Sequence, residues 1–410
     1  MDVQLQLQGT VNSIAITITG SKSESNRLLL LQALYPNIRI HNLSKSDDSD
    51  AMQMALSGNE KVVDIHHAGT AMRFLTAYYA VKEGSEVVLT GSSRMKERPI
   101  GVLVDALKSL GAKIEYVENE GFPPLKITGQ KLKKSEVSIK ADVSSQYISA
   151  LLLIAGRLEN GLELTLDGEI TSRPYIDMTL SLLDEIGVEN HFEGNVIRIA
   201  ATSEIAEQKT SVVVESDWSS ASYFYSIVAL ATQGTKVTLS SYKKNSLQGD
   251  SALADIYKQL GVETGYAENS IILSKIENFK PVAINLELNN TPDIAQTIAV
   301  TCFGLGIGCE LTGLHTLKIK ETDRLEALKT EMEKLGAKIS VTNNSLILKA
   351  SGIPNKDVAI ATYNDHRMAM AFTPLAIKTS IIIEDAGVVS KSYPAFWDDL
   401  SKLGFSVSEK

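Results

Sequence analysis

A glycine that directly follows a leucine or an isoleucine recurs along this chain at nearly regular spacing. Each time, the pair closes an apolar, helix-like pattern and precedes a short strand pattern. Glycine is the residue expected just past a helix C-terminus, where the backbone turns left-handed. With a degraded copy ending at Gly58, the pattern predicts six helix-and-strand units. The five clear copies are separated by 76, 74, 75 and 68 residues and lie at Gly111, Gly187, Gly261, Gly336 and Gly404.

Six units divide most simply into two domains of three. The pattern breaks at Gly20-Ser21, after a first strand region over residues 2–19, and again at Glu215-Ser216-Asp217. We therefore expect one domain over residues 21–215 and a second formed by residues 1–20 and 216–410, so that two linkers connect them. Ligands commonly bind between such halves, and the active site is expected in the interdomain cleft.

The composition narrows the functional class. The chain has 410 residues, 44% of them apolar, and a net charge of −9, which argues against broad attraction to nucleic acid or anionic lipid. No apolar run approaches the ~20 residues of a membrane span, and the N-terminus alternates like a strand rather than a signal peptide. The two cysteines, Cys302 and Cys309, lack metal-ligand spacing and are interpreted as buried thiols. The sequence predicts a soluble, cytoplasmic, metal-free protein.

Two cations and two carboxylates are crowded into the five residues Lys320-Glu321-Thr322-Asp323-Arg324. They stand at the start of a helical pattern that runs from Leu325 to Leu335, and on such a helix Lys320 and Arg324 are expected to share a face. A helix N-terminus repels cations and favours anions. The cluster is therefore either a solvated group of local ion pairs or a site for an anionic ligand, with Glu321 as a nearby acid or base.

Other turns that enter helices are also rich in cations or small residues. The segment from Gly20 to Arg27 joins a strand to an apolar helix expected to begin near Leu28, and it suits either an oxyanion cradle or simple helix capping. At the turn around Gly69 the glycine permits close approach of a ligand, while Arg73 is expected to tie the turn down. The loop from Arg94 to Pro99 is either a basic site or a solvated loop before another helix.

The set of such residues is more informative than any one member, because the chain is acidic overall. A cleft that collects them suits a pair of substrates with several negative charges, with two carboxylates available for proton transfer. The carboxylates are Asp293 and Glu321, and the cations are Lys22, Arg27, Arg98, Lys320, Arg324, Arg367 and Lys391.

Together these stretches resemble the 5-enolpyruvylshikimate-3-phosphate (EPSP) synthase family over essentially the whole chain. The most specific elements are the segment from Ala68 to Arg73 and the segment from Lys320 to Leu325. The resemblance implies a two-domain α/β (α+β) inside-out barrel of the enolpyruvyl transferase type, with three βαβαββ units in each domain. It implies transfer of the enolpyruvyl group of phosphoenolpyruvate to the 5-hydroxyl of shikimate 3-phosphate, in the shikimate pathway to chorismate and aromatic amino acids. It also implies a monomer without a metal or organic cofactor, and glyphosate as a possible inhibitor.

The resemblance implies a role for each matching residue. The catalytic residues are Asp293, Glu321 and Lys22: Asp293 accepts the proton of the attacking hydroxyl, and Glu321 exchanges the proton at the methylene carbon of phosphoenolpyruvate. The residues that bind shikimate 3-phosphate are Lys22, Ser23, Arg27, Ser144, Ser145, Gln146, Ser172, Tyr175, Asp293 and Lys320. Those that bind phosphoenolpyruvate are Lys22, Gly69, Arg98, Gln146 and Lys391, together with Arg324 and Arg367 at its carboxylate.

The sequence departs from the usual family pattern at four positions. His66 stands where a glycine is common, His67 where an asparagine is common, and Phe74 where a proline follows the arginine. Thr316 replaces an asparagine that generally contacts shikimate 3-phosphate. The first three border the phosphoenolpyruvate pocket of the family, and we expect them to alter sensitivity to glyphosate.

Three other readings compete with this one. The sister family transfers enolpyruvate to UDP-N-acetylglucosamine, but it usually has a cysteine in the loop that corresponds to residues 92–98, and this chain has none there. RNA 3′-phosphate cyclases share the domain plan, yet the net charge of −9 argues against a polynucleotide substrate. A non-catalytic anion-binding protein would be favoured by loss of Lys22, Asp293 or Glu321, and all three are present.

Overall fold

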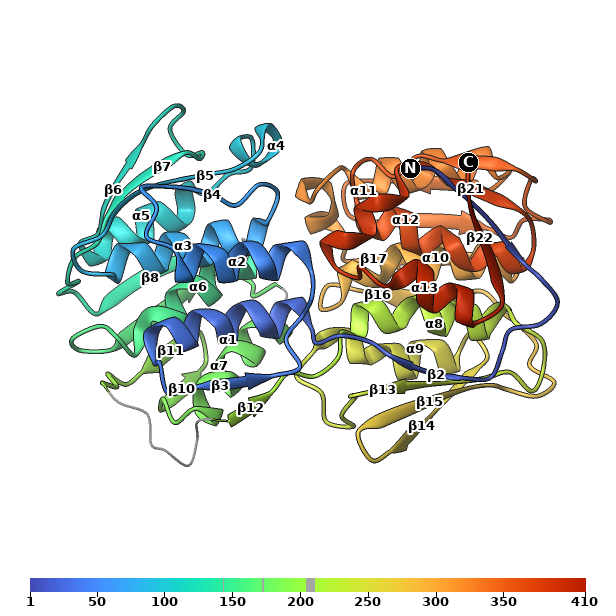
Figure 1. Cartoon of the computed structure of the whole chain (residues 1–410), viewed down its shortest axis with the longest axis horizontal. Helices are drawn as coiled ribbons and strands as arrows, with labels where there is room; N and C mark the ends of the chain where they lie inside the picture. Colours follow the sequence, from blue (N-terminus) through green and yellow to red (C-terminus); the bar gives the residue numbers. More distant parts are fainter. Residues whose placement is uncertain (143, 172, 204–210) are drawn as a thin grey trace. The chain divides into compact units, whose positions relative to one another are not determined.

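The computed structural model describes residues 1–142, 144–171, 173–203 and 211–410. The chain divides into two compact units. One consists of Gly20–Val214, and the other combines Met1–Thr19 with Glu215–Lys410. Each unit has its own sheets and its own buried helices, and each is described by itself below (Figure 1).

Five four-stranded sheets share one strand order. The first two strands of each are parallel, and the other two are antiparallel to each other, with one of them antiparallel to the second strand. In four of the sheets a helix joins the first two strands directly, whereas in the fifth the first strand comes from the start of the chain. This is the βαβαββ pattern. In the unit Gly20–Val214 it is formed first by β4 (Val62–Asp64), α3 (Gly69–Val81), β5 (Glu86–Thr90), α5 (Gly101–Leu110), β6 (Lys113–Tyr116) and β7 (Leu125–Thr128). It is formed again by β8 (Glu136–Lys140), α6 (Ser145–Ala155), β9 (Leu162–Asp167), α7 (Arg173–Glu185), β10 (Asn190–Glu193) and β11 (Val196–Ile199).

The third sheet of this unit is reduced to one parallel pair. Strand β3 (Arg39–His41) pairs with β12 (Ser211–Val213), and the helices α1 (Lys22–Leu34) and α2 (Asp47–Ser57) accompany it. The unit therefore contains three sheets, of which two have the complete pattern among the described residues.

The other unit contains three complete sheets, and the start of the chain supplies one strand to each of two of them. The first has β2 (Ala15–Thr17), β13 (Lys236–Ser240), β14 (Val262–Ala267) and β15 (Ser270–Lys275), with α8 (Trp218–Leu230) and α9 (Leu253–Lys258). The second has β16 (Ile284–Glu287), α10 (Ala295–Gly304), β17 (Cys309–Thr312), α11 (Arg324–Lys334), β18 (Lys338–Val341) and β19 (Leu346–Lys349). The third has β20 (Val358–Ile360), α12 (His366–Phe372), β21 (Ile381–Ile383), α13 (Phe396–Lys402), β22 (Phe405–Glu409) and β1 (Val3–Leu7), with β1 between β21 and β22.

In each unit the sheets lie at the periphery and the first helix of each pattern runs through the interior (Figure 1). Helix α8 is an example, because all 13 of its residues are buried. Its small hydroxyl side chains tolerate that burial because they bond to neighbouring helices: Ser226 accepts a hydrogen bond from Thr301 of α10 at 2.7 Å. The expected inside-out arrangement, with helices inside, is confirmed.

The predicted helix-ending glycines are confirmed. Gly111, Gly187, Gly261, Gly336 and Gly404 all have a positive φ, between 87° and 108°. Gly58 is different. Helix α2 does end at Ser57, but Gly58 has a φ of −81°, so the degraded copy lacks the left-handed cap of the others.

The predicted start of α1 is wrong, and the structure changes the expected surroundings of two other helix starts. Helix α1 begins at Lys22 rather than near Leu28, because Ser21 caps it by accepting a hydrogen bond from the Glu24 amide. Helix α11 begins at Arg324, since Asp323 accepts from two amides of the first turn. Lys320 therefore precedes that helix and does not share a helical face with Arg324. The basic loop before α5 contains a short helix of its own, α4 (Ser93–Lys96).

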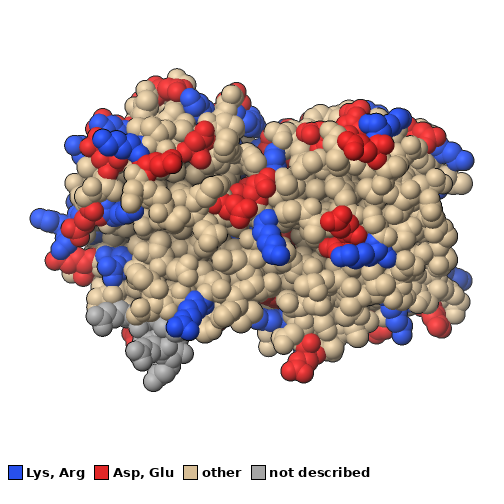
Figure 2. Space-filling model, in the orientation of Figure 1, with Lys and Arg blue, Asp and Glu red and all other residues tan. Residues whose placement is uncertain are grey.

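On the face shown in Figure 2, acidic and basic side chains are interspersed rather than gathered in one patch. Cys302 and Cys309 are both buried free thiols, as predicted. In the part of the chain that the structure describes, no helix is both long and apolar enough to cross a lipid bilayer.

Candidate functional site

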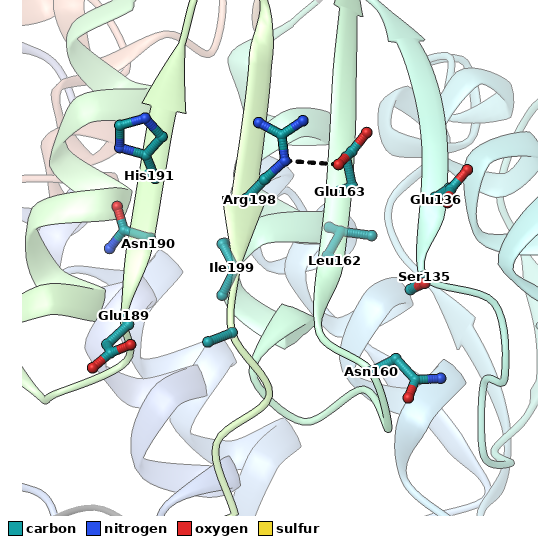
Figure 3. A pocket seen from close by; sticks show the side chains of 11 residues that line it. Ser135, Glu136, Asn160, Leu162, Glu163, Glu189, Asn190, His191, Arg198 and Ile199 are labelled. Atoms are coloured by element: carbon teal, nitrogen blue, oxygen red, sulfur yellow. Dashed lines mark hydrogen bonds and ion pairs between the residues drawn. The ribbon is translucent and has the colours of Figure 1, made fainter.

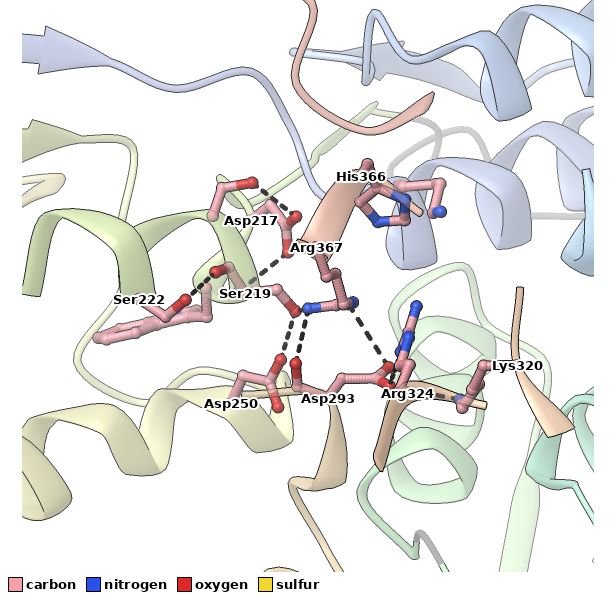
Figure 4. Close-up of polar contacts among 12 residues, drawn as sticks. Asp217, Ser219, Ser222, Asp250, Asp293, Lys320, Arg324, His366 and Arg367 are labelled. Atoms are coloured by element: carbon pink, nitrogen blue, oxygen red, sulfur yellow. Dashed lines mark hydrogen bonds and ion pairs between the residues drawn. The ribbon is translucent and has the colours of Figure 1, made fainter. Parts of the chain in front are cut away.

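Asp293 is the centre of a buried group of charges in the unit that contains residues 215–410 (Figure 4). One carboxylate oxygen, Oδ1, lies 2.8 Å from Arg324 Nη1 and 3.4 Å from Lys320 Nζ. The other, Oδ2, lies 3.4 Å from Arg367 Nη2. The residue is held by the short helical turn Pro292–Ile294, directly before α10. Three of the cations singled out in the sequence are thus brought to one of the two predicted carboxylates.

Arg324 joins Asp293 to two further carboxylates. Its guanidinium donates from Nη2 to Glu321 at 2.6 Å and from Nε to Asp365 at 2.7 Å. The arginine is 2% exposed, whereas Glu321 is 23% exposed and Lys320 is 27% exposed. Glu321 and Lys320 are therefore exposed enough to contact a ligand from solvent, while the buried Arg324 holds the three carboxylates together.

The electrostatics of this group follow from burial and pairing. Burial alone would raise the pKa of Asp293, but Lys320, Arg367 and Arg324 outweigh it and hold that pKa well below its usual range. Burial likewise opposes the charge of Arg324, but the surrounding carboxylates raise its pKa above the ordinary value. Asp293 and Arg324 are therefore both charged at neutral pH. An anionic ligand would compete with the carboxylates for the same cations, and this would raise the proton affinity of Asp293.

Arg367 and Lys391 are also anchored in this unit. Arg367 donates from Nη1 to the Asp293 carbonyl at 3.0 Å and from Nη2 to Ser219 Oγ at 3.2 Å. Lys391 is buried and donates from Nζ to the carbonyl and side-chain oxygens of Asn364, at 2.7 and 2.6 Å.

A second group of predicted residues lies in the unit Gly20–Val214. Lys22 Nζ is 3.3 Å from Asp48 Oδ2, and His67 Nε2 is 3.7 Å from the other oxygen of the same carboxylate. The guanidinium of Arg98 lies against Gly69, since a Cβ at that glycine would be 2.5 Å from Arg98 Nη1. The close approach to Gly69 is made by the side chain of Arg98, and the approach of a ligand to this glycine stays a prediction.

Arg27 is buried in the same unit and is held by neutral oxygens. It donates to Thr179 Oγ1 at 2.7 Å, to Ser149 Oγ at 2.9 Å and to two backbone carbonyls, one of them that of Tyr175. Burial lowers its pKa to about 10, with Tyr175 and Glu24 acting in the opposite direction. No ion pair of Arg27 with a carboxylate is found among the described residues. A buried cation without such a pair is a natural place for an anionic group to bind.

The remaining predicted residues of this unit are positioned by helix starts. Ser144 caps α6 and accepts from the Gln146 amide at 3.4 Å, and the Gln146 side chain donates to Thr70 at 3.2 Å. Ser145 is buried in the first turn of α6, and Ser23 lies in the first turn of α1. Ser172 lies outside the described residues.

Arg73 ties down its turn, as predicted. It donates to the carbonyls of Gly69 at 3.2 Å and Pro99 at 2.9 Å. Among the described residues, no group of three or more histidine, cysteine, aspartate or glutamate side chains is suited to hold a metal ion.

Sequence reasoning missed Asp365 and Asp48 as members of these groups. Both occupy positions typical of helix starts: Asp365 caps α12 by accepting from the Arg367 amide at 2.8 Å, and Asp48 is in the first turn of α2. Because helix capping alone explains an aspartate at a helix start, nothing in the sequence indicated that Asp365 contacts Arg324 or that Asp48 contacts Lys22.

A hollow of about 490 Å³ lies elsewhere, on the outer side of the sheet β10-β11-β9-β8 (Figure 3). Its side chains include Arg198 and Glu163, which form a cross-strand ion pair at 2.7 Å, both about half exposed. None of the predicted site residues is among those that line it.

The model of the EPSP synthase (3-phosphoshikimate 1-carboxyvinyltransferase) family matches residues 55–400 of the chain. The chain belongs to this family. A 3-phosphoshikimate 1-carboxyvinyltransferase of Bacteroides fragilis is 47% identical over 406 residues, which cover 96% of this chain and 95% of the relative. One of a Sulfurovum species is 37% identical over 425 residues, covering 97% of each.

Solved structures of EPSP synthase and of another enolpyruvyl transferase share the fold. EPSP synthase from Acinetobacter baumannii superposes with a TM-score of 0.80 at 22% identity, with 100% of each chain covered. The enolpyruvyl transferase NikO from Streptomyces tendae has a TM-score of 0.73 at 13% identity, with 100% of this chain and 99% of that chain covered. The enolpyruvyl transferase fold that the motifs of the sequence implied is thereby confirmed.

Proposed function

We propose that this protein is a 3-phosphoshikimate 1-carboxyvinyltransferase, an enzyme of the shikimate pathway to aromatic amino acids. It transfers the enolpyruvyl group of phosphoenolpyruvate to the 5-hydroxyl of shikimate 3-phosphate and releases phosphate. Family membership supports the reaction. The observation that carries its mechanism is the contact of Asp293 with Lys320, Arg324 and Arg367, beside a second carboxylate, Glu321, on the same arginine.

In the proposed addition step, the 5-oxygen of shikimate 3-phosphate forms a bond to C2 of phosphoenolpyruvate, Asp293 accepts the proton of the hydroxyl, and Glu321 in its protonated form gives a proton to the methylene carbon. In the elimination step, Glu321 takes a proton back from that carbon, the bond from C2 to the phosphate oxygen breaks, and the proton on Asp293 passes to the leaving phosphate. The low pKa of Asp293 belongs to the ligand-free protein. Because bound anions offset the three neighbouring cations, substrate binding raises that pKa and makes the carboxylate a better base.

Each substrate has a proposed set of anchors. For phosphoenolpyruvate, Arg324 and Arg367 bind the carboxylate, and Lys22, Gly69, Arg98 and Lys391 bind the phosphate, with Gln146 between the two substrates. The proximity of Arg98 to Gly69 supports the phosphate assignment. For shikimate 3-phosphate, the proposed residues are Lys22, Ser23, Arg27, Ser144, Ser145, Gln146, Ser172, Tyr175, Asp293 and Lys320. The buried Arg27 donates its hydrogen bonds to neutral oxygens, and this supports its pairing with the shikimate carboxylate.

Further properties belong to the same proposal. We expect a cytoplasmic monomer, and we expect glyphosate to bind in place of phosphoenolpyruvate. His66, His67 and Phe74 are the residues proposed to change its inhibition constant. An inhibition constant for glyphosate equal to that of a strongly sensitive family member would contradict this part of the proposal.

The test is phosphate release from phosphoenolpyruvate and shikimate 3-phosphate by the pure protein. We expect release only when both substrates are present, and a loss of about 100-fold or more in kcat for Asp293→Asn and Glu321→Gln, because each loses a proton-transfer group. Asp399→Asn is the matched control: that carboxylate is also buried, but it bonds to Tyr393 and Lys402 rather than to the Asp293 group.

Two outcomes would redirect the assignment. Phosphate release with UDP-N-acetylglucosamine in place of shikimate 3-phosphate would favour the sister activity. Absence of release with either acceptor, together with calorimetric binding of phosphoenolpyruvate, would leave an anion-binding protein.

A further inference from the structure

Asp250 is a buried carboxylate to which the proposed reaction gives no role. It lies in the short helical turn Gly249–Ala252 and is 5% exposed. Its Oδ2 accepts a hydrogen bond from the hydroxyl of Ser219, in the first turn of α8 (Figure 4). No ion pair of Asp250 is found in the described residues. Burying an ionised carboxylate in this way is costly, so its presence here calls for an explanation.

The direction of the hydrogen bonds explains what Asp250 does to Ser219. A serine hydroxyl has one hydrogen and two lone pairs. Because the hydrogen points to Asp250, the oxygen must act as an acceptor toward its other neighbour. That neighbour is Arg367, whose Nη2 donates to Ser219 Oγ at 3.2 Å.

Three contacts with described residues fix the Arg367 guanidinium, and the hydrogen bond to Ser219 is one of them. The other two go to Asp293: Nη1 to its backbone carbonyl at 3.0 Å, and Nη2 to its carboxylate at 3.4 Å. Both of these come from one side, the turn before α10. The Ser219 contact comes from α8 and prevents the planar group from rotating about its contact with Asp293.

We propose that Asp250 is a positioning residue: through the Ser219 hydroxyl it holds the Arg367 guanidinium in the orientation that receives the carboxylate of phosphoenolpyruvate. The inference rests on the proposed function, in which Arg367 binds that carboxylate. The inference adds to that function a residue that contacts neither substrate. Burial, acting against the attraction of Arg367, raises the pKa of Asp250 to about 6, so the carboxylate is mostly ionised and an acceptor at neutral pH.

The expected signature is a change in substrate affinity rather than in the chemical step. The carboxylate of phosphoenolpyruvate keeps its charge throughout the reaction, so its contacts are equally strong in ground and transition states. We expect Ser219→Ala and Asp250→Ala each to raise the KM for phosphoenolpyruvate about tenfold, the size of one hydrogen bond to a charged group. The kcat and the KM for shikimate 3-phosphate should change by less than about threefold.

Two further variants separate positioning from a loss of packing. Asp250→Asn retains a side-chain oxygen that can accept from Ser219, so its KM for phosphoenolpyruvate should lie between those of the wild type and Asp250→Ala. In the double variant Ser219→Ala with Asp250→Ala, the KM should stay within about threefold of the worse single variant, because Asp250 acts through Ser219. Asp399→Asn serves again as the control with an unchanged KM.

Each result has a defined consequence. An unchanged KM for phosphoenolpyruvate in Ser219→Ala or Asp250→Ala, with an active wild type, overturns the positioning role and leaves the proposed function intact. Effects of the two variants that multiply in the double variant also overturn it. An inactive wild type instead overturns the proposed function, and the role of Asp250 with it. If Asp250→Ala does not fold, Ser219→Ala and Asp250→Asn decide the question.

Discussion

Two buried aspartates in the same unit have pKa values that are shifted in opposite directions. Asp293 has three cations within 3.4 Å and a lowered pKa, whereas Asp250 is bonded to a hydroxyl and has a raised one. Burial acts in the same direction on both, so direct contact with cations decides the difference. Asp293 is thereby ionised next to the proposed chemistry, whereas the ionised form of Asp250 lowers the stability of the fold.

That cost predicts a pH dependence of stability. The pKa of Asp250 is about 6 in the folded protein against an ordinary 3.8, so the folded state binds the proton more tightly. The stability associated with the protonated form is therefore present below pH 4 and is lost as the pH rises through 6. The shift corresponds to about 3 kcal/mol. Asp250→Asn removes this loss, so its free energy of unfolding relative to wild type should rise by up to about that amount between pH 4 and pH 7.

Urea unfolding at several pH values measures this difference. A difference between variant and wild type that does not change from pH 4 to pH 7 would show that Asp250 titrates as an ordinary carboxyl group. The result is independent of the kinetic test, because it requires no substrate.

At the residue scale, the sequence indicated the cations better than their partners. Arginine and lysine at the start of a helix are unusual, and the positions of Arg324 and Arg367 were recognised for that reason. Aspartate at the same position is ordinary. Asp365 both caps α12 and pairs with Arg324, and only the three-dimensional structure reveals the second contact.

At the scale of the elements, the helix ends were the most predictable feature. Gly111 ends α5 with a φ of 108°, and a Cβ added there would meet nothing within 4 Å. Gly111→Ala therefore tests backbone strain alone. We expect a loss of about 1–2 kcal/mol, the cost of a left-handed conformation for an L-residue. In differential scanning calorimetry the midpoint of the unit Gly20–Val214 should fall by roughly 2–4 °C per kcal/mol.

Gly352→Ala is the matched control. A Cβ at Gly352 also meets nothing within 4 Å, but its backbone is not left-handed. Its stability should stay within about 0.5 kcal/mol of wild type. Equal losses at the two glycines would contradict the assignment of the cost to the left-handed backbone.

The helix starts were less predictable than the ends, and α1 shows why. The prediction followed the apolar run that begins at Leu28, but the helix begins six residues earlier. The first turns carry polar side chains that are nonetheless buried: Ser25 accepts from the Ser44 amide at 2.8 Å, and Asn26 accepts from Ser49 at 2.9 Å. An apolar periodicity cannot detect a helix face that packs through hydrogen bonds.

At the scale of the whole molecule, the two units differ in how their sequences are connected. The unit Gly20–Val214 is continuous, whereas the other requires β1 to pair with β22, with Val3 opposite Glu409. In the continuous unit, β4 pairs with β5 through Val62 and Val88. Closing a loop of about 400 residues costs about 2.5 kcal/mol more than closing one of about 25, by the (3/2)RT ln n relation.

This difference predicts an order of folding. In refolding from urea, the amides of β4 and β5 should become protected before those of β1 and β22, because long-range pairing carries the larger entropic cost. Pulse-labelling hydrogen exchange read by mass spectrometry distinguishes the two sets of peptides. Simultaneous protection of both would mean that the two units fold as one cooperative structure.

The central place of β1 in its sheet also has a consequence for synthesis in the cell. The strand leaves the ribosome before both of its partners, β21 and β22, which follow it in the sequence by roughly 400 residues. At ~5–20 residues per second, the interval is roughly 20–80 s. Throughout it, the buried side chains of Val3 and Leu5 have no sheet to enter. The risk of aggregation for a nascent copy is therefore set by the rate of translation, and not by the stability of the finished fold.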